Sequence, residues 1–348
     1  MKDIIRVFQI AFTYIGTIVG AGFATGREIL QFFTQYGHWA TLTIILATGL
    51  FIWLGTKILM ISRRIGAKSF EDLNKFLFGA KSGSWISVFM FVILLGVNSI
   101  MLAGAGSVFV EHLNIGYQTG LFVTMIGAYF ILRKGIQSIM TMNSLVVPMM
   151  ITLSIAVISQ TFQSPGATRF LTLTTDQSLP AAWLAPLLYT AFNLVLAMPV
   201  LVPLGNQTEK TAVVKWGGIL GGAGVGFMLM AAHFALSAQM PGISQFEIPM
   251  GSIAAHLGWF VQMIYLILIF LEIFSTFVAN IYGITLQVQQ WTSWSSRTIA
   301  FGIMLFCYFF SQFGFSSLLS LLYPIFGGLC LLWVLRLTLF GTPLTNPK

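Results

Sequence analysis

The residues best suited to chemistry lie inside the first long apolar run of the chain. Glycine weakens a helix by about 1 kcal/mol relative to alanine, and in lipid every freed backbone group is costly unless it is satisfied. A helix that breaks in this run would turn free N–H and C=O groups toward a ligand or ion. The alternative is close helix packing through small-xxx-small pairs, which leaves the adjacent charged residues Arg27 and Glu28 unexplained. The run contains glycines and then a charged pair: Gly16, Gly20, Gly22, Gly26, Arg27 and Glu28.

An unwound segment around Gly20–Gly22 would aim N–H groups into a cavity. They would lie at the positive end of a half-helix that we expect from about Ala24, where a carboxylate or another anion is favoured. Arg27 and Glu28 are candidates for an outer gate, or they simply pair with each other. The residues expected to bind substrate here are Gly20, Ala21, Gly22 and Phe23.

A second constellation lies in a later apolar run, where Glu272, Ser275 and Thr276 share one helix face. A carboxylate in mid-membrane costs about 2.5–3.5 kcal/mol, so it requires a partner or a proton. Two hydroxyls beside it, together with carbonyls freed in the first run, supply the oxygen ligands that a small cation prefers. The alternative is a protonated Glu272 that is hydrogen-bonded within the bundle, with hydroxyls bonded back to their own helix.

Further polar residues in apolar runs are candidates for contacts with a substrate. Asn98 and Ser99, together with Thr190 and Asn193, would bind its polar groups. A hydrogen bond within the bundle is the alternative for each of them. His233 is either a proton site or a buried histidine with satisfied nitrogens. The apolar side of a substrate would contact aromatic rings: Phe23, Tyr189 and Phe192.

Other signals indicate packing. Gly218, Gly222 and Gly226 lie in a glycine-rich run that has neither the preceding strand nor the Gly-Lys-Ser/Thr ending of a nucleotide-binding loop. We expect them to form a helix-packing stripe. Cys307 and Cys330 lie in apolar runs without metal-ligand spacing, so we expect neither a metal site nor a disulfide. The sequence shows no catalytic triad or acidic cluster, and we do not expect an enzyme.

The composition places these residues in a membrane. Of 348 residues, 57% are hydrophobic and 7% are charged, whereas a soluble domain carries roughly 25% charged residues. The formal net charge of +8 is not a signal for nucleic acid, because the basic residues follow membrane topology. We therefore expect an integral membrane protein whose partners are the lipid bilayer and a small-molecule substrate. The oligomeric state stays open.

Apolar runs of about 20 residues mark spanning helices, and we expect ten. With the N-terminus inside, every Lys and Arg except Arg27 and Arg169 falls in an inside segment, so both termini are expected in the cytoplasm. Ser69–Leu73 starts a short amphipathic helix between the second and third spans. The approximate spans are Phe8–Phe33, Trp39–Ile61, Ser84–Val110, Gly120–Leu132, Leu145–Thr161, Ala181–Leu204, Lys215–Ala238, Trp259–Gln290, Thr298–Phe313 and Leu318–Leu339.

Ten spans with both termini inside form two five-span units of opposite orientation within one transmembrane domain, residues 1–348. The repeats cover residues of about 5–161 and about 181–339. Paired broken helices in inverted halves indicate a transporter's substrate site. We predict an all-α integral membrane fold in which helices 1 and 6 are discontinuous. Glycines interrupt the first, and the sixth is interrupted by Pro186, Asn193, Pro199 and Pro203.

The run Gly20-Ala-Gly-Phe-Ala-Thr-Gly-Arg-Glu-Ile-Leu-Gln-Phe-Phe33 resembles the YkvI family of bacterial membrane proteins. That family is similar to a branch of the amino acid–polyamine–organocation superfamily, and the ten-span layout extends the resemblance over essentially the whole chain. The resemblance implies the LeuT fold of two inverted five-helix repeats and a bacterial inner or plasma membrane location. It implies no settled substrate.

The resemblance also implies positions for a coupling ion. Sodium-coupled members of the wider fold use backbone carbonyls at the break of span 1 and a Ser/Thr pair on span 8. Glu272 departs from this pattern, because sodium-coupled relatives often have a small residue there. Its carboxylate would strengthen sodium binding or carry a proton, so Na⁺ and H⁺ both stay open. Span 6 departs as well, with Ala191-Phe192-Asn193 in place of glycines. The matching positions for sodium are Gly16, Val19, Ser275 and Thr276.

Together these observations predict a cation-coupled secondary transporter of a small amino-acid-like solute. It would work by alternating access between a bundle (spans 1, 2, 6 and 7) and a scaffold (spans 3, 4, 8 and 9). The alternatives are proton-coupled transport of another small organic solute and a ligand sensor with a transporter fold.

Overall fold

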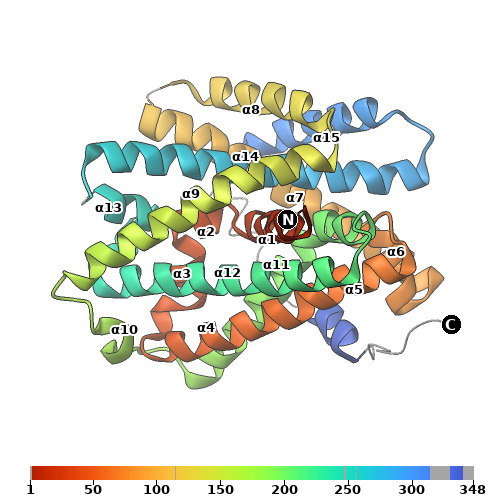
Figure 1. The fold of residues 1–348 in the computed structure, drawn as a ribbon. Helices are drawn as coiled ribbons and strands as arrows, with labels where there is room; N and C mark the ends of the chain where they lie inside the picture. Colours follow the sequence, from red (N-terminus) through yellow and green to blue (C-terminus); the bar gives the residue numbers. More distant parts are fainter. Residues whose placement is uncertain (1, 114, 247, 256, 314–329, 340–348) are drawn as a thin grey trace.

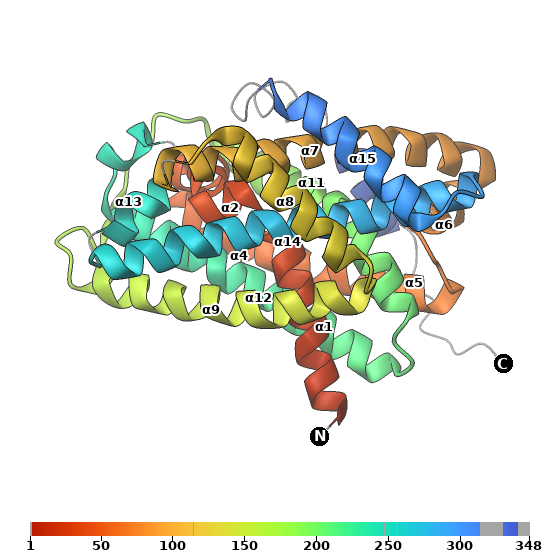
Figure 2. The ribbon, with the colours of Figure 1, turned by 90° about the horizontal axis from the view of Figure 1, so that it is seen from above.

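The computed structural model describes residues 2–113, 115–246, 248–255, 257–313 and 330–339. Within these ranges all regular structure is helical, which confirms the expected all-α class. Figure 1 shows α9, α12 and α14 running alongside one another, with α8 and α15 on one side and α4 and α5 on the other. Seen from above, α2 and the C-terminal half of α1 lie among these helices, and the N-terminal end of α1 projects beyond them (Figure 2).

In chain order the elements are α1 (Lys2–Ile18), α2 (Ala21–Thr25), α3 (Arg27–Phe32), η1 (Thr34–Tyr36), α4 (Trp39–Leu50), η2 (Phe51–Gly55), α5 (Thr56–Ile65), α6 (Phe70–Phe78), α7 (Ala80–Leu113), α8 (Tyr117–Leu132), α9 (Ile136–Phe162), α10 (Arg169–Thr172), α11 (Leu179–Asn206), α12 (Thr211–Ala238), η3 (Gly242–Gln245), α13 (Pro249–Ala255), α14 (Trp259–Trp291) and α15 (Ser296–Ser311).

Six helices in the described ranges are long and apolar enough to cross a membrane, and they match six expected spans. Shorter apolar helices cover the fourth and ninth spans, and Cys330–Leu339 covers the end of the tenth. The rest of the tenth span, 318–329, lies outside the described residues. The chain is therefore a multi-pass helical membrane protein. The count of ten and the inverted repeat stay predictions.

The first span is broken where the glycines predict it. α1 ends at Ile18 and α2 begins at Ala21, and the Gly20 N–H donates to the Ile18 carbonyl at 3.0 Å. The expectation of one half-helix from about Ala24 is wrong, because a second bend at Gly26 separates α2 from α3. Gly26 has φ of +82°, and a Cβ atom there would lie 2.6 Å from Met250 Cγ. Backbone conformation and close packing both require glycine at this bend.

The expected break in the sixth span is wrong. α11 is one continuous helix, Leu179–Asn206, with Pro186, Pro199 and Pro203 inside it. No glycine interrupts its middle, and the Asn193 side-chain amide donates to the Tyr189 carbonyl of its own helix at 3.0 Å. Packing around a transmembrane helix holds such proline-containing turns together. The two first spans of the proposed repeats therefore differ, with one broken and one continuous.

The α12 glycines form the expected packing stripe. A Cβ atom at Gly218 would lie 2.6 Å from Thr56 Oγ1, one at Gly222 would lie 2.6 Å from the Ile52 backbone of η2, and one at Gly226 would lie 2.2 Å from Thr48 Oγ1. The neighbouring Gly221 extends the stripe toward α1, because a Cβ atom there would lie 2.4 Å from the Tyr14 ring. η2 is a single π-helical turn, and the Tyr14 hydroxyl donates to the Phe51 carbonyl in it at 2.8 Å. Hydrogen-bond registers of this kind are found mostly as isolated turns. The stripe therefore seats α1 and the π turn directly on α12.

The C-terminal end of α14 is fixed by Glu71 of α6. Ser69 caps α6 in a capping box with Asp72, which confirms the short helix expected there. The buried Glu71 carboxylate pairs with Lys75 at 2.8 Å and accepts a hydrogen bond from Trp291 Nε1 at 2.6 Å. It also accepts hydrogen bonds from two further side chains, those of Ser84 and Gln287. One carboxylate thus joins α6, α7 and α14.

Burial alone raises the pKa of the Glu71 carboxyl, but hydrogen bonds from Lys75, Trp291 and Ser84 and the charge of Lys75 outweigh it, so the pKa lies below its ordinary value. A lowered folded-state pKa adds stability that is present above the unfolded value of about 4.3 and is lost as the pH falls through the folded value. We expect the unfolding temperature to fall more steeply below that pH in the parent protein than in Glu71→Gln. Thermal unfolding in detergent at pH 6, 4 and 3 measures this slope.

The control is Glu209→Gln, which removes an exposed carboxylate in the turn between α11 and α12. It should keep the acid sensitivity of the parent protein. Equal slopes for the parent protein and Glu71→Gln would contradict the assignment.

Candidate functional site

A seam of buried oxygens runs along the middle of α14. Glu272, Thr276 and Asn280 follow one another at successive helical turns and are 0%, 7% and 1% exposed. Among the described residues, neither carboxylate oxygen of Glu272, nor Thr276 Oγ1, nor Asn280 Oδ1 has a hydrogen-bond partner. An unsatisfied buried polar group costs about 1–3 kcal/mol, and a charged one costs more. This α14 seam therefore has the chemistry to hold a proton or a small cation.

The break of the first span meets this seam. α1 and α2 both contact α14. A Cβ atom at Gly20 would lie 4.0 Å from Thr276 Cγ2 and 3.8 Å from Met101 Cε of α7. The two constellations singled out in the sequence, far apart along the chain, are thus brought together in space.

Gly16 of α1 lies against a residue that the sequence analysis did not single out. Because the Gly20 N–H bonds to Ile18, the Gly16 carbonyl loses its usual helical donor. A Cβ atom at Gly16 would lie 2.6 Å from Asn143 Cγ of α9, and Asn143 Oδ1 has no partner among the described residues. The sequence feature that could have identified Asn143 is an amide side chain within an apolar span. Its amide oxygen adds a candidate cation ligand beside Gly16. Val19 is fully buried in the break.

Ser275 matches the alternative in which a hydroxyl bonds back to its own helix. Its hydroxyl donates to the Glu272 carbonyl of its own helix at 3.1 Å. The Ser/Thr pair is therefore asymmetric, because the neighbouring Thr276 hydroxyl has no such bond in the described part of the chain.

The charged pair after the break points to two different neighbours. The exposed Arg27 guanidinium donates to the carbonyls of Ser244 and Phe246, at 3.1 Å each. Glu28 is 7% exposed, and its carboxylate lies so close to Gly22 that a Cβ atom there would be 2.2 Å from Oε1. Arg27 therefore ties the first span to the loop before α13, whereas Glu28 faces the break.

Tyr189 extends the Glu28 side of the site into α11. It interacts electrostatically with Glu28, and its ring lies 5.1 Å from that of Phe33 and 6.2 Å from that of Phe51. Thr190 and Phe192 are buried beside it. Asn193 bonds within α11, whereas Tyr189 interacts with Glu28 beside the break.

Other candidates lie elsewhere. Asn98 of α7 donates to Cys307 Sγ of α15 at 3.7 Å, and Ser99 bonds to the Leu95 carbonyl of its own helix. Phe23 lines a cavity of about 20 Å³ with Tyr265, space for about one water molecule. His233 is fully buried, with its ring nitrogens 3.1 Å from the Thr34 hydroxyl and 3.4 Å from that of Thr41. His233 is therefore a buried histidine whose ring nitrogens are satisfied, and not the alternative proton site.

Known proteins resemble this chain in sequence and in fold. The membrane protein YkvI of Bacillus subtilis (strain 168) is 39% identical over 332 residues, which cover 94% of this chain and 93% of the relative. The protein YyaD of the same organism is 27% identical over 327 residues, 94% of each chain. No family model matches the sequence.

Solved structures of transporters share the fold. A Na⁺-coupled sialic acid symporter superposes with a TM-score of 0.71 at 13% identity, covering 96% of this chain and 79% of the symporter. Mhp1, a nucleobase-cation-symport-1 family transporter, gives 0.62 at 12% identity with 93% and 77% covered. A manganese transporter of Eremococcus coleocola gives 0.62 at 11% identity with 99% and 81% covered.

Gly20 and Gly22 in the break differ in whether they have room for a side chain. Gly20 has φ of −97° and ψ of −168°, which any residue adopts, and a Cβ atom there meets ordinary contacts. A Cβ atom at Gly22 would displace the buried Glu28 carboxylate. We expect Gly20→Ala to change stability by less than about 0.5 kcal/mol and Gly22→Ala to destabilise by about 1–3 kcal/mol. Thermal unfolding of the purified variants measures both.

A double-mutant cycle of Gly22→Ala with Glu28→Ala isolates the contact. The double variant should lose less stability than the sum of the single variants, with a coupling of about 0.5–3 kcal/mol. Strict additivity would contradict this packing.

Proposed function

The chain belongs to the family of the membrane protein YkvI, and from that premise we propose that it is a secondary transporter that couples movement of a small solute to a cation. Its fold is shared with cation-coupled transporters. The observation that carries the proposal is the meeting of a broken first helix with the buried α14 seam. Unwound backbone at membrane depth is tolerated where it lines a cavity or a site.

We assign the coupling ion to the space between the break and the seam. The candidate oxygen ligands come from α1 and the break after it, from α9 and from α14: the Gly16 and Val19 carbonyls, Asn143 Oδ1, and the oxygens of Thr276 and Glu272. Hard oxygen donors suit Na⁺, and Glu272 adds the negative charge. A cation bound here pulls α1 toward α14, because it supplies partners to oxygens on both helices at once. Ion binding would thereby order the first span and close one side of the site.

The solute is proposed to be amino-acid-like. Its carboxylate would meet the backbone N–H groups of the Gly20–Gly22 segment, and its amino group would pair with Glu28. Glu28 suits this role because it is buried, negatively charged and against Gly22. Tyr189 would contact the apolar part from the α11 side. An ion pair of this kind is strong only in a site that excludes water, as the exposures of Glu28 and Tyr189, 7% and 1%, indicate.

We also propose that both termini face the cytoplasm of a bacterial cell. In Figure 1, α10 and α13 lie at the left end of the bundle and α6 at the right end. The right end carries the basic residues around α6 and the turns that follow α8 and α14, including Lys75, Arg133 and Arg297. Positive charge gathers on cytoplasmic loops.

Replacement of Na⁺ by K⁺ tests the ion site. We expect Na⁺ to raise the unfolding temperature of the parent protein and to drive solute uptake into proteoliposomes, and we expect Thr276→Ala to lose both effects. A ligand at 100 times its dissociation constant adds about 2.7 kcal/mol, which a thermal scan resolves. The control is Thr124→Ala, a buried threonine whose hydroxyl bonds to its own helix, and it should keep the Na⁺ response.

The same scan across pH separates the two coupling ions. A response that follows pH, ignores Na⁺ and disappears in Glu272→Gln would assign the coupling to a proton and overturn the Na⁺ site. Binding of a solute without any accumulation in proteoliposomes would make the protein a sensor instead of a transporter.

Pairs of solutes test the role of Glu28. We expect small amino acids to stabilise the protein and to be transported. The matching 2-hydroxy acids lack the amino group and should bind at least about tenfold more weakly, because a lost charged hydrogen bond costs about 1.5–3 kcal/mol. In Glu28→Gln this preference should shrink. Equal binding of both members of each pair by the parent protein would contradict the proposed solute class.

A further inference from the structure

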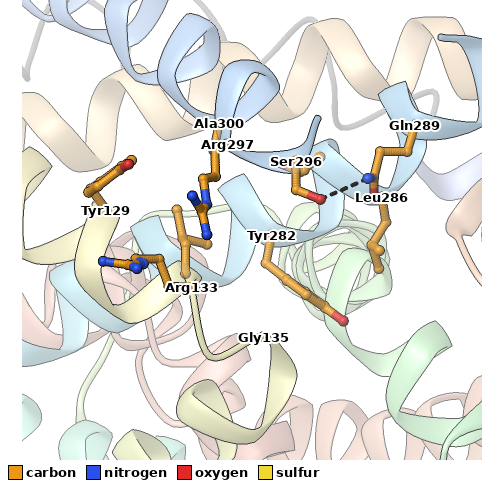
Figure 3. Close-up of a pocket in the computed structure, with 11 residues that line it drawn as sticks. Tyr129, Arg133, Gly135, Tyr282, Leu286, Gln289, Ser296, Arg297 and Ala300 are labelled. Atoms are coloured by element: carbon orange, nitrogen blue, oxygen red, sulfur yellow. Dashed lines mark hydrogen bonds between the residues drawn. The ribbon is translucent and has the colours of Figure 1, made fainter. Parts of the chain in front are cut away.

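A separate cavity of about 320 Å³ lies between the C-terminal end of α8, the second half of α14 and the start of α15. Figure 3 shows the guanidinium groups of Arg133 and Arg297 on one side of it, with Tyr282, Gln289 and Ser296 on the other. None of its lining residues is acidic. Neither arginine belongs to the salt bridges Lys75–Glu71 and Lys210–Asp3 of the described residues.

The lining combines positive charge with an unused hydrogen-bond donor. Thr285 lines the cavity, is 6% exposed, and its hydroxyl has no partner among the described residues. α15 begins at Ser296 on the cavity wall, and the start of a helix favours an anion. Arginine forks match phosphate oxygens in a bidentate way. These groups together suit a phosphate or a phosphodiester.

The remaining wall is apolar, and it continues onto surfaces that face outward. Leu132, Leu286 and Ala300 line the cavity. The neighbouring Phe130 of α8 and Phe301 of α15 are 59% and 57% exposed. In a membrane protein such outward apolar faces meet acyl chains, so a molecule with a phosphate in the cavity has a place for a hydrocarbon tail beside it.

From these observations we infer that the cavity between α8, α14 and α15 is a binding site for an anionic phospholipid, with the headgroup phosphate held by Arg133, Arg297 and Thr285. Basic pockets between membrane helices bind such headgroups. The site is independent of the proposed transport function, because it shares no residue with the α14 seam or the break. It lies on the same helix as the seam, so an occupied site fastens the second half of α14 to α8 and α15.

Lipid titration of the full-length protein in detergent tests the inference. Dioleoyl phosphatidylglycerol should raise the unfolding temperature and appear as a bound lipid by native mass spectrometry. Dioleoyl phosphatidylcholine should require at least about tenfold more lipid for the same effect. In Arg133→Gln/Arg297→Gln the preference for phosphatidylglycerol should be lost. The control Lys134→Gln/Lys215→Gln removes the same charge from exposed residues outside the cavity lining and should keep it.

A milder variant keeps the test informative if the double variant fails to fold. Thr285→Val preserves both arginines and should weaken phosphatidylglycerol binding by about tenfold, as expected for a hydrogen bond to a charged group. Equal loss of binding in the lysine control would show general attraction to anionic lipid and overturn the site. Equal stabilisation by inorganic phosphate and by phosphatidylglycerol would assign the cavity to a free anion, and no preference over phosphatidylcholine would also refute it.

Discussion

The structure depends on oxygens that lie inside an apolar helix bundle without partners in the described protein. Glu272, Thr276 and Asn280 occupy successive turns of α14. In water, each of their oxygens would find a hydrogen-bond donor at little cost. Keeping them buried is unfavourable unless something else completes the site. The break at Gly20 lies against this seam, and there the backbone of α1 is also irregular. Two costly features in one place are typical of a functional site rather than of a structural core.

α14 connects the regions described above. Near its start, the Tyr265 hydroxyl donates to the Ala24 carbonyl of α2. Its middle carries the seam, and its end is bound by Glu71 of α6. The arginine-lined cavity lies on another face of the same helix, at Tyr282 and Thr285. One helix thus contacts the proposed ion site, the broken first span and the proposed lipid site, so its position affects all three.

The sequence was most informative where one residue type has one physical meaning. Glycines in the first span predicted a break, and the break is at Gly20. The second bend at Gly26 depends on contact with Met250, which no local pattern reveals. The prolines of α11 suggested an interruption, but the surrounding helices keep the turns of that helix intact. Asn143 was missed because its partner, the Thr13 carbonyl, lies in another helix far along the chain.

The glycine stripe of α12 has a mechanical consequence. Where a ring or a backbone rests directly on a glycine, as Tyr14 does on Gly221 and Ile52 on Gly222, no side chain between them can change rotamer to absorb sliding. The Tyr14 hydroxyl also holds the π turn. α1, the π turn and α12 should therefore move together as one rigid body. Any relative motion would then be taken up elsewhere, and the contact between the break and the α14 seam, whose oxygens form no fixed hydrogen bonds in the described part of the chain, is the place that this packing leaves for it.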